Sequence, residues 1–160
     1  MSTNLGPNLP ARLVDLFSGN DLPAKVGPAA VLVTQGTDGF PHPCIVTPGE
    51  IVAGNDSTLR LALYRESTAT RNLRERKAGT LCLADGGFGY YVKLEAEPFA
   101  TQEPALQPLA VFTLTPRHVL QDGEAGAEVT SGFRFRDLAG DDHCLSGWQP
   151  IVAALQGTFN

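Results

Sequence analysis

The stretch Thr58-Leu59-Arg60-Leu61-Ala62-Leu63-Tyr64 decides the fold class, because leucine occupies every second position in it. A repeat of two residues is the period of a β-strand that turns one face toward a core. Leu59, Leu61 and Leu63 would then share that face. The pattern predicts a half-buried strand.

Other runs of strand length surround this one. We expect further strands over residues 29–34, 40–47, 80–84, 88–96, 109–114 and 129–135. The pairs Asp38-Gly39 and Asp85-Gly86 supply the positive φ that hairpin turns need. Pro41 and Pro43 cannot donate to a strand ladder, so the strand that contains them is predicted at a sheet edge or at a bulge.

Three short helices complete the prediction. Asn8 is a candidate N-cap for an opening helix that stops at Gly19. Ser67 or Thr68 caps a second helix, which Gly79 closes, and residues 146–155 fit a third. Six or seven strands with hairpin turns and few helices indicate a closed or nearly closed antiparallel β-barrel.

The composition fits one domain over residues 1–160. The net charge of -5 argues against a nucleic-acid partner. No apolar run is long enough to cross a membrane, and the N-terminus lacks a signal-peptide pattern, so we expect a cytoplasmic protein with no membrane contact. The cysteines, Cys44, Cys82 and Cys144, form no paired motif and are expected as buried free thiols rather than metal ligands.

The segment Arg65-Glu66-Ser67-Thr68-Ala69-Thr70-Arg71-Asn72 follows the alternating strand directly. A helix that begins here leaves backbone N–H groups unpaired and carries a partial positive charge, so it stabilises an anion. The side chains that could contact phosphate oxygens are those of Arg65, Ser67, Thr68, Thr70 and Arg71. An ordinary capped helix on a solvated surface explains the same spacing. The residues alone leave both interpretations open.

Other residues carry weaker signals. His42, His118 and His143 are candidate acid-base groups, since histidine alone has an ordinary pKa near neutrality. Trp148 and the pair Tyr90-Tyr91 could line a pocket or pack in the core. The remaining polar signals are Asp141-Asp142-His143-Cys144, which we interpret as a polar loop, and Arg134 and Arg136, which flank Phe135 in a predicted strand.

Four motifs in order resemble the pyridoxamine 5′-phosphate oxidase-like family. They are Gly39-Phe40-Pro41-His42-Pro43, Thr47-Pro48-Gly49-Glu50, Leu59-Arg60-Leu61-Ala62-Leu63 and Ser67-Thr68-Ala69-Thr70-Arg71-Asn72-Leu73. The resemblance covers about residues 26–99 well and the rest in outline. It implies a mainly β fold, a six-stranded antiparallel split β-barrel with a few short flanking helices, which forms a homodimer with two flavin mononucleotide (FMN) sites at the subunit interface.

The resemblance also implies positions for the cofactor. The phosphate would lie at Ser67 or Thr68, Thr70 and Arg71, followed by Asn72, with Arg65 close by. The isoalloxazine ring would lie along Ile45, Val46, Thr47 and Pro48, and along Leu63 and Tyr64. In such proteins backbone groups usually contact the ring.

The chain departs from the vitamin B6 oxidase of this family. Pro43-Cys44-Ile45-Val46 replaces a basic strand motif, and Gln156-Gly157-Thr158-Phe159-Asn160 replaces an arginine-containing C-terminal motif. The substrate of that enzyme is therefore not supported. We expect an FMN-dependent oxidoreductase acting on an unidentified small molecule, with no catalytic side chain assigned. The alternatives are a flavin carrier or sensor, a haem or tetrapyrrole binder that uses His118 or His143, and a reductase that uses deazaflavin (F420).

Overall fold

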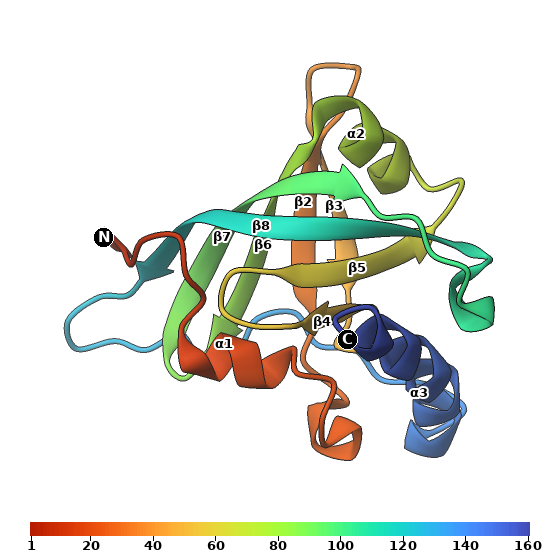
Figure 1. Ribbon diagram of the computed structural model, residues 1–160. Helices are drawn as coiled ribbons and strands as arrows, with labels where there is room; N and C mark the ends of the chain where they lie inside the picture. The colour runs from red at the N-terminus through yellow and green to blue at the C-terminus, as the bar shows by residue number, and fades with distance from the viewer.

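The computed structural model describes all 160 residues, and one curled antiparallel sheet of eight strands dominates it (Figure 1). The strand order is β3-β2-β6-β7-β8-β5-β4, with β1 paired to β8. The strands are β1 Ser2–Asn4, β2 Ala30–Gln35, β3 Pro41–Val46, β4 Ile51–Ala53, β5 Leu59–Tyr64, β6 Ala78–Asp85, β7 Phe88–Pro98 and β8 Leu109–Asp122. The α-helices are α1 Ala11–Leu16, α2 Thr68–Arg76 and α3 Asp141–Gly157, and two 3-10 turns span Leu22–Lys25 and Pro104–Leu106.

The fold is mainly β with a few helices, as expected, and its sheet forms a curled half-barrel; the expected strand count of six was wrong. The strands β1 and β4 have three residues each, too few for an alternating pattern to stand out. No strand forms over residues 129–135, where only two isolated bridges occur, from Val129 to Gly87 and from Arg134 to Pro28. The final strand, β8, continues to Asp122 instead of ending at Leu114.

The strand that contains Pro41 and Pro43 lies at the sheet edge, as predicted. It is β3, which pairs only with β2 and is the first strand in the sheet order. A proline has no backbone N–H to donate, and on the open side of an edge strand no ladder hydrogen bond is lost by this. The backbone N–H and C=O groups on one side of β3 therefore have no strand partner.

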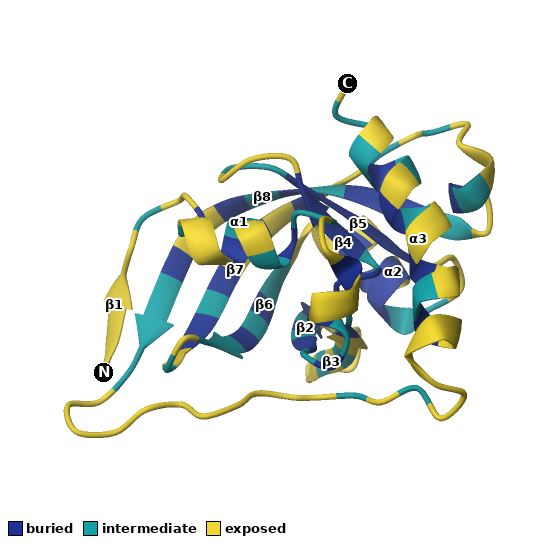
Figure 2. Ribbon diagram, turned by 90° about the horizontal axis from the view of Figure 1, so that it is seen from below, coloured by how far each residue is buried: buried dark blue, intermediate teal, exposed yellow.

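The prediction that β5 is half-buried was wrong, because both of its faces are covered. Leu59, Leu61 and Leu63 enter the barrel core, but Arg60 and Ala62 on the other face are buried as well. Helix α3 covers that face with an apolar cluster that includes Trp148, Val152 and Leu155 (Figures 1 and 2).

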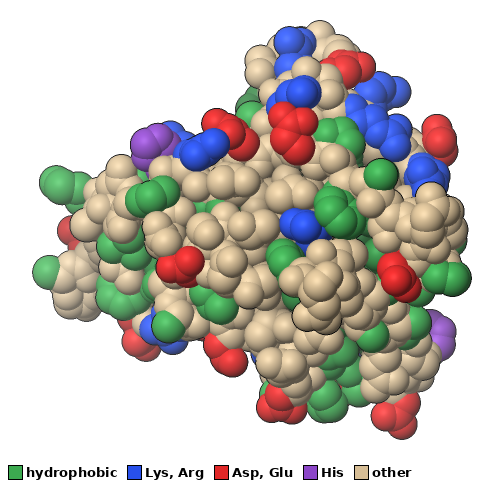
Figure 3. All heavy atoms as spheres, in the orientation of Figure 1, with side chains coloured by type: hydrophobic (Ala, Val, Ile, Leu, Met, Phe, Trp, Pro, Cys, Tyr) green, Lys and Arg blue, Asp and Glu red, His purple; other side chains and the backbone are tan.

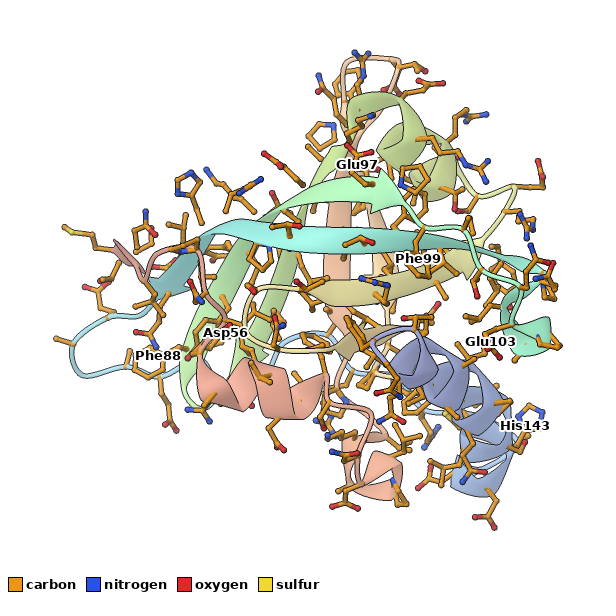
Figure 4. The ribbon with its side chains drawn as sticks, in the orientation of Figure 1. Asp56, Phe88, Glu97, Phe99, Glu103 and His143 are labelled. Carbon is orange, nitrogen blue, oxygen red and sulfur yellow. The ribbon has the colours of Figure 1, made fainter.

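Arg60 is held under this cover by aromatic rings. Its guanidinium carbon lies 4.1 Å from the ring centre of Phe99, labelled in Figure 4, and 4.6 Å from that of Phe159. The Nε and Nη1 atoms of Arg60 are buried without a hydrogen-bond partner. Burial accordingly lowers the pKa of Arg60, and the cation–π contacts offset part of the desolvation cost.

Three helix boundaries differ from the sequence-based expectations. Asn8 does not cap α1: its side chain donates to Asp56 at 2.7 Å, and Pro10 occupies the N-cap position. Helix α2 ends at Arg76, and its C-cap Lys77 adopts a left-handed φ of 55°; Gly79 belongs to β6 and does not close the helix. Residues 141–144 form the first turn of α3, not a polar loop.

No helix of the chain combines the length and the apolar composition that crossing a membrane requires.

Leu61→Ala should lower the free energy of unfolding by about 2–5 kcal/mol, since Leu61 is 1% exposed and the truncation leaves a cavity in the core. Urea denaturation followed by circular dichroism measures this change. Leu138→Ala is the matched control: this leucine is 91% exposed, so its truncation should shift stability by no more than about 0.5 kcal/mol. Equal effects of the two substitutions would contradict the assignment of the core.

Candidate functional site

The turn from β5 into α2 is fixed by side-chain hydrogen bonds of its own residues. Ser67 is the N-cap of α2, as expected, and its hydroxyl oxygen accepts from the Thr70 amide at 3.1 Å. The Ser67 hydroxyl donates to Thr70 Oγ1 at 3.0 Å, and Thr70 in turn donates to the Tyr64 carbonyl at 2.7 Å. These bonds join the end of the strand to the start of the helix.

The start of α2 keeps two donors free. The backbone amides of Thr68 and Ala69 have no partner within the chain, as is usual in the first turn of a helix. Arg71, one turn further along, is exposed and makes no ion pair. Lys and Arg side chains gather over α2 at the top of the face shown in Figure 3. The local field therefore favours an anion although the chain as a whole is acidic.

A small cavity lies between this helix start and the β2–β3 hairpin. Its volume is about 190 Å³. The residues that line it are Gly36, Thr37, Asp38, Phe40, Pro41, His42, Thr68 and Arg71. Asp38 is the one carboxylate there, and its Oδ1 accepts from the Phe40 amide at 3.0 Å. That bond holds the tip of the hairpin opposite Arg71.

Three large apolar side chains are exposed on these elements, and one of them, Phe40, lines the cavity. Phe40 is 71% exposed, Ile45 on β3 is 47% exposed and Tyr64 at the end of β5 is 75% exposed. They lie around the open side of β3 and the β5–α2 turn, so apolar surface and unpaired backbone groups of an edge strand occur together. Such a surface is typical of a site that another molecule covers.

The structure brings only some of the expected phosphate contacts to the cavity. Thr68 and Arg71 line it, with Ser67 adjacent. Thr70 is fully buried, and its hydroxyl is engaged in the cap. Asn72 is also buried and donates to Thr34 Oγ1 at 3.0 Å, so it fastens α2 to β2.

Arg65 points elsewhere. Its Nε donates to the Gln107 carbonyl at 2.8 Å, and its side chain lines a separate cavity with Arg74 and Leu109. The guanidinium of Arg65 therefore lies away from the cavity beside Arg71.

Of the residues expected along the isoalloxazine ring, Val46, Pro48 and Leu63 are buried, whereas Ile45 and Tyr64 are exposed. Val46 and Pro48 present no free side chain, so contact with a ring there would pass through the backbone. Thr47 donates through its amide and its hydroxyl to Glu50 Oε2, at 2.7 and 2.8 Å. These bonds close the turn that leads from β3 to β4.

Burial controls the ionisation of the side chains near this turn. It raises the pKa of the Cys44 thiol to about 11, and the Glu50 charge adds to the effect. It also raises the pKa of Glu50, although the two bonds from Thr47 act in the opposite direction. All three cysteines are free thiols, as expected, but only Cys144 is buried, whereas Cys44 and Cys82 are partly exposed. Cys44 is neutral near pH 7.

Only one histidine lies at the cavity. His42 lines it, whereas His118 on β8 contacts Asn4 at 3.5 Å. His143 is on the outer side of α3 (Figure 4), with its Nδ1 2.8 Å from the Asp137 carboxylate. Trp148 is buried and stacks on Phe135, with ring centres 5.6 Å apart, so it belongs to the core.

Thr37 and Asp38 are not among the expected site residues. The Asp38-Gly39 pair predicts the hairpin but gives no sign of what the hairpin tip faces. That contact depends on the curl of the sheet, which brings β3 against α2. Arg134 and Arg136 were expected on a strand, but they lie in the irregular segment before α3.

Comparisons with known proteins identify relatives of this chain. No family model matches it. It is 30% identical over 145 residues to the uncharacterized protein YclD of Bacillus subtilis (strain 168), a match that covers 91% of this chain and 94% of YclD.

Two solved structures share the fold. One, from Lactobacillus delbrueckii and described as a "putative pyridoxamine 5′-phosphate oxidase", has a TM-score of 0.57 at 20% identity and covers 72% of this chain and 97% of its own. The other, a heme binding protein from Mycobacterium smegmatis, has a TM-score of 0.51 at 17% identity and covers 78% of this chain and 58% of its own. The long match to YclD shows that the two proteins belong to one family, and the solved structures show that the chain has the split-barrel fold of pyridoxamine 5′-phosphate oxidase-like proteins.

Proposed function

We propose that this chain binds FMN, with the phosphate at the start of α2, and that it acts as an FMN-dependent oxidoreductase on a small-molecule substrate. The observation that carries the proposal is the cavity in which Arg71, the Thr68 side chain and a helix N-terminus meet beside an open strand edge. The resemblance of the motifs and of the fold to a family that binds flavin supports the same ligand.

The hydrogen-bond donors at the start of α2 suit a phosphate group. The Thr68 and Ala69 amides donate along the helix axis, where the helix dipole favours an anion. Arg71 adds a charge-assisted contact from the same turn. In this arrangement Ser67, Thr70 and Asn72 hold the helix start in place and do not contact the phosphate directly.

The isoalloxazine ring would lie along the open side of β3. Backbone groups on that side have no strand partner, and Ile45 on the same strand exposes apolar surface, as does Tyr64 at the end of β5. A single chain leaves this surface uncovered, so we include a homodimer in the proposal, with the second copy covering the ring. Phe40 at the hairpin tip would belong to the same contact.

The chain's own groups bind and orient the cofactor and keep water from it. FMN, when bound, supplies the transfer of a hydride to or from the substrate. Arg71 and the helix start fix the phosphate end, and the rigid edge of β3 fixes the ring end. His42 is the histidine that lines this cavity, and we assign it no acid–base role.

Haem and deazaflavin are the competing ligands. The neighbour from Mycobacterium smegmatis is a heme binding protein, which gives haem a specific basis. Against haem, His118 and His143 line neither the cavity beside Arg71 nor a larger one under residues 123–133. A phosphate-bearing deazaflavin would use the same anion site as FMN, so the two flavins must be separated by experiment.

The purified protein, supplied with FMN and passed through a desalting column, should keep the absorption bands of an oxidised flavin. The bands should bleach under anaerobic conditions when NADH or NADPH is added, because the bound flavin accepts a hydride. Parallel trials with haem and with the deazaflavin cofactor are the controls. Retention of either competitor, with no retention of FMN, would overturn the proposal.

Arg71→Ala should weaken FMN binding by about 1.5–3 kcal/mol, the range for a hydrogen bond to a charged group. This corresponds to roughly a ten- to hundredfold rise in Kd. Isothermal titration calorimetry measures the affinity. Arg76→Ala is the matched control, because Arg76 lies in the last turn of the same helix and does not line the cavity. Equal losses in both variants would mean that α2 contributes only its general charge, and no loss in either would mean that the phosphate lies elsewhere.

A further inference from the structure

A cavity larger than the one beside Arg71 lies away from the proposed phosphate site. It has a volume of about 570 Å³, within the usual range for small-molecule pockets. Its floor is the outer face of the sheet, and its cover is the irregular segment 123–133 that follows β8. Figure 2 shows the chain after β8 crossing below the sheet toward α3.

The floor is one apolar row of side chains. Val31 on β2 pairs with Cys82 on β6, and Cys82 pairs with Tyr91 on β7, so the three lie side by side. On β3 the same row continues to Ile45, the residue exposed beside the open edge. Adjacent strands are about 4.8 Å apart, so the floor begins one strand away from that edge.

The cover is held in a defined position. The Val129 amide donates to the Gly87 carbonyl at 2.9 Å, and the Ala29 amide donates to the Phe133 carbonyl at 3.0 Å. Gly132 comes so close to β6 that a Cβ on it would lie 3.2 Å from the Cβ of Ala84. The segment is therefore fixed over the row, with Val129 and Phe133 adding apolar walls.

The charges around the cavity are almost all negative. Asp122, Glu124 and Glu128 line it, and no Lys or Arg does. The one positive group is the amino terminus of Met1, which lies 3.4 Å from Asp122 Oδ1 at a fully exposed position. The Tyr91 hydroxyl also donates to Asp122, at 3.2 Å. An apolar floor with an acidic rim accepts neutral or cationic apolar molecules and repels anions.

We infer that the cavity between the row Val31–Cys82–Tyr91 and the segment 123–133 is a binding site for a neutral or cationic apolar small molecule. This site is distinct from the anion site at α2, since the two share no lining residue and carry opposite charge. The inference does not rest on the proposed binding of FMN. If FMN does bind along β3, the ligand of this cavity lies one strand away from it and is a candidate substrate.

Two dyes that differ in one charged group test the inference on the full chain without added FMN. N-phenyl-1-naphthylamine is neutral, and 1-anilinonaphthalene-8-sulfonate carries the same rings with a sulfonate. The neutral dye should bind saturably at one site per chain, with enhanced fluorescence, and the sulfonate should bind at least about tenfold more weakly because of like-charge repulsion. Equal affinities, or no saturable binding of the neutral dye, would overturn the inference.

Substitutions locate the dye. Cys82→Phe fills the floor and should weaken binding of the neutral dye at least about tenfold, while FMN binding stays unchanged. Thr80→Phe is the matched control: Thr80 lies on the same face of β6, two residues away, and does not line this cavity. Equal effects of the two phenylalanines would place the dye elsewhere.

Charge reversal on the exposed rim tests the inference even if the Cys82→Phe variant fails to fold. Glu124→Lys combined with Glu128→Lys changes only exposed positions. It should raise the affinity for the sulfonate dye about tenfold or more and leave that for the neutral dye within about twofold. An unchanged preference between the two dyes in this variant would overturn the assignment of the acidic rim.

Discussion

The ladder between β7 and β8 is the constraint on which the rest of this structure depends. It is the longest pairing in the sheet and connects the β3-β2-β6 half with the β5-β4 half. Its register shifts between Lys93 and Leu94, where Lys93 faces His118 and Leu94 faces Pro116. An extra residue in one strand bends the sheet and increases its twist. The resulting curl carries the β2–β3 hairpin toward α2 and so creates the cavity beside Arg71.

The regular parts of the fold could be predicted from the sequence because each local pattern extends over enough residues to be recognised. The alternating leucines of β5, the edge prolines of β3 and the Ser67 cap were all found where the sequence placed them. Pro116 explains why the sequence predicted that this strand ends at Leu114, because a proline removes a ladder donor. At the register shift that donor is not needed. The strand passes through it to Asp122.

The directions of individual side chains could not be read in this way. Arg60 alternates with leucines and was expected to face water, but α3, distant in sequence, covers it. Thr70 and Arg71 are neighbours in the chain, yet one is fully buried and the other exposed. Arg65 turns to a backbone carbonyl on the loop before β8, a contact that only tertiary structure creates. Motif spacing therefore pointed to a segment that lines the cavity beside Arg71, but not to the particular side chains of that segment that line it.

The hydrogen bonds among Ser67, Thr70 and Tyr64 have a further consequence. They are satisfied within the chain, so the free amides of Thr68 and Ala69 hold their orientation before any ligand arrives. An anion that binds there need not order the loop, and the entropy that loop ordering usually costs is already lost on folding. Association at this point should be fast and close to rigid-body docking, with the tightness of the complex set by how slowly the ligand leaves.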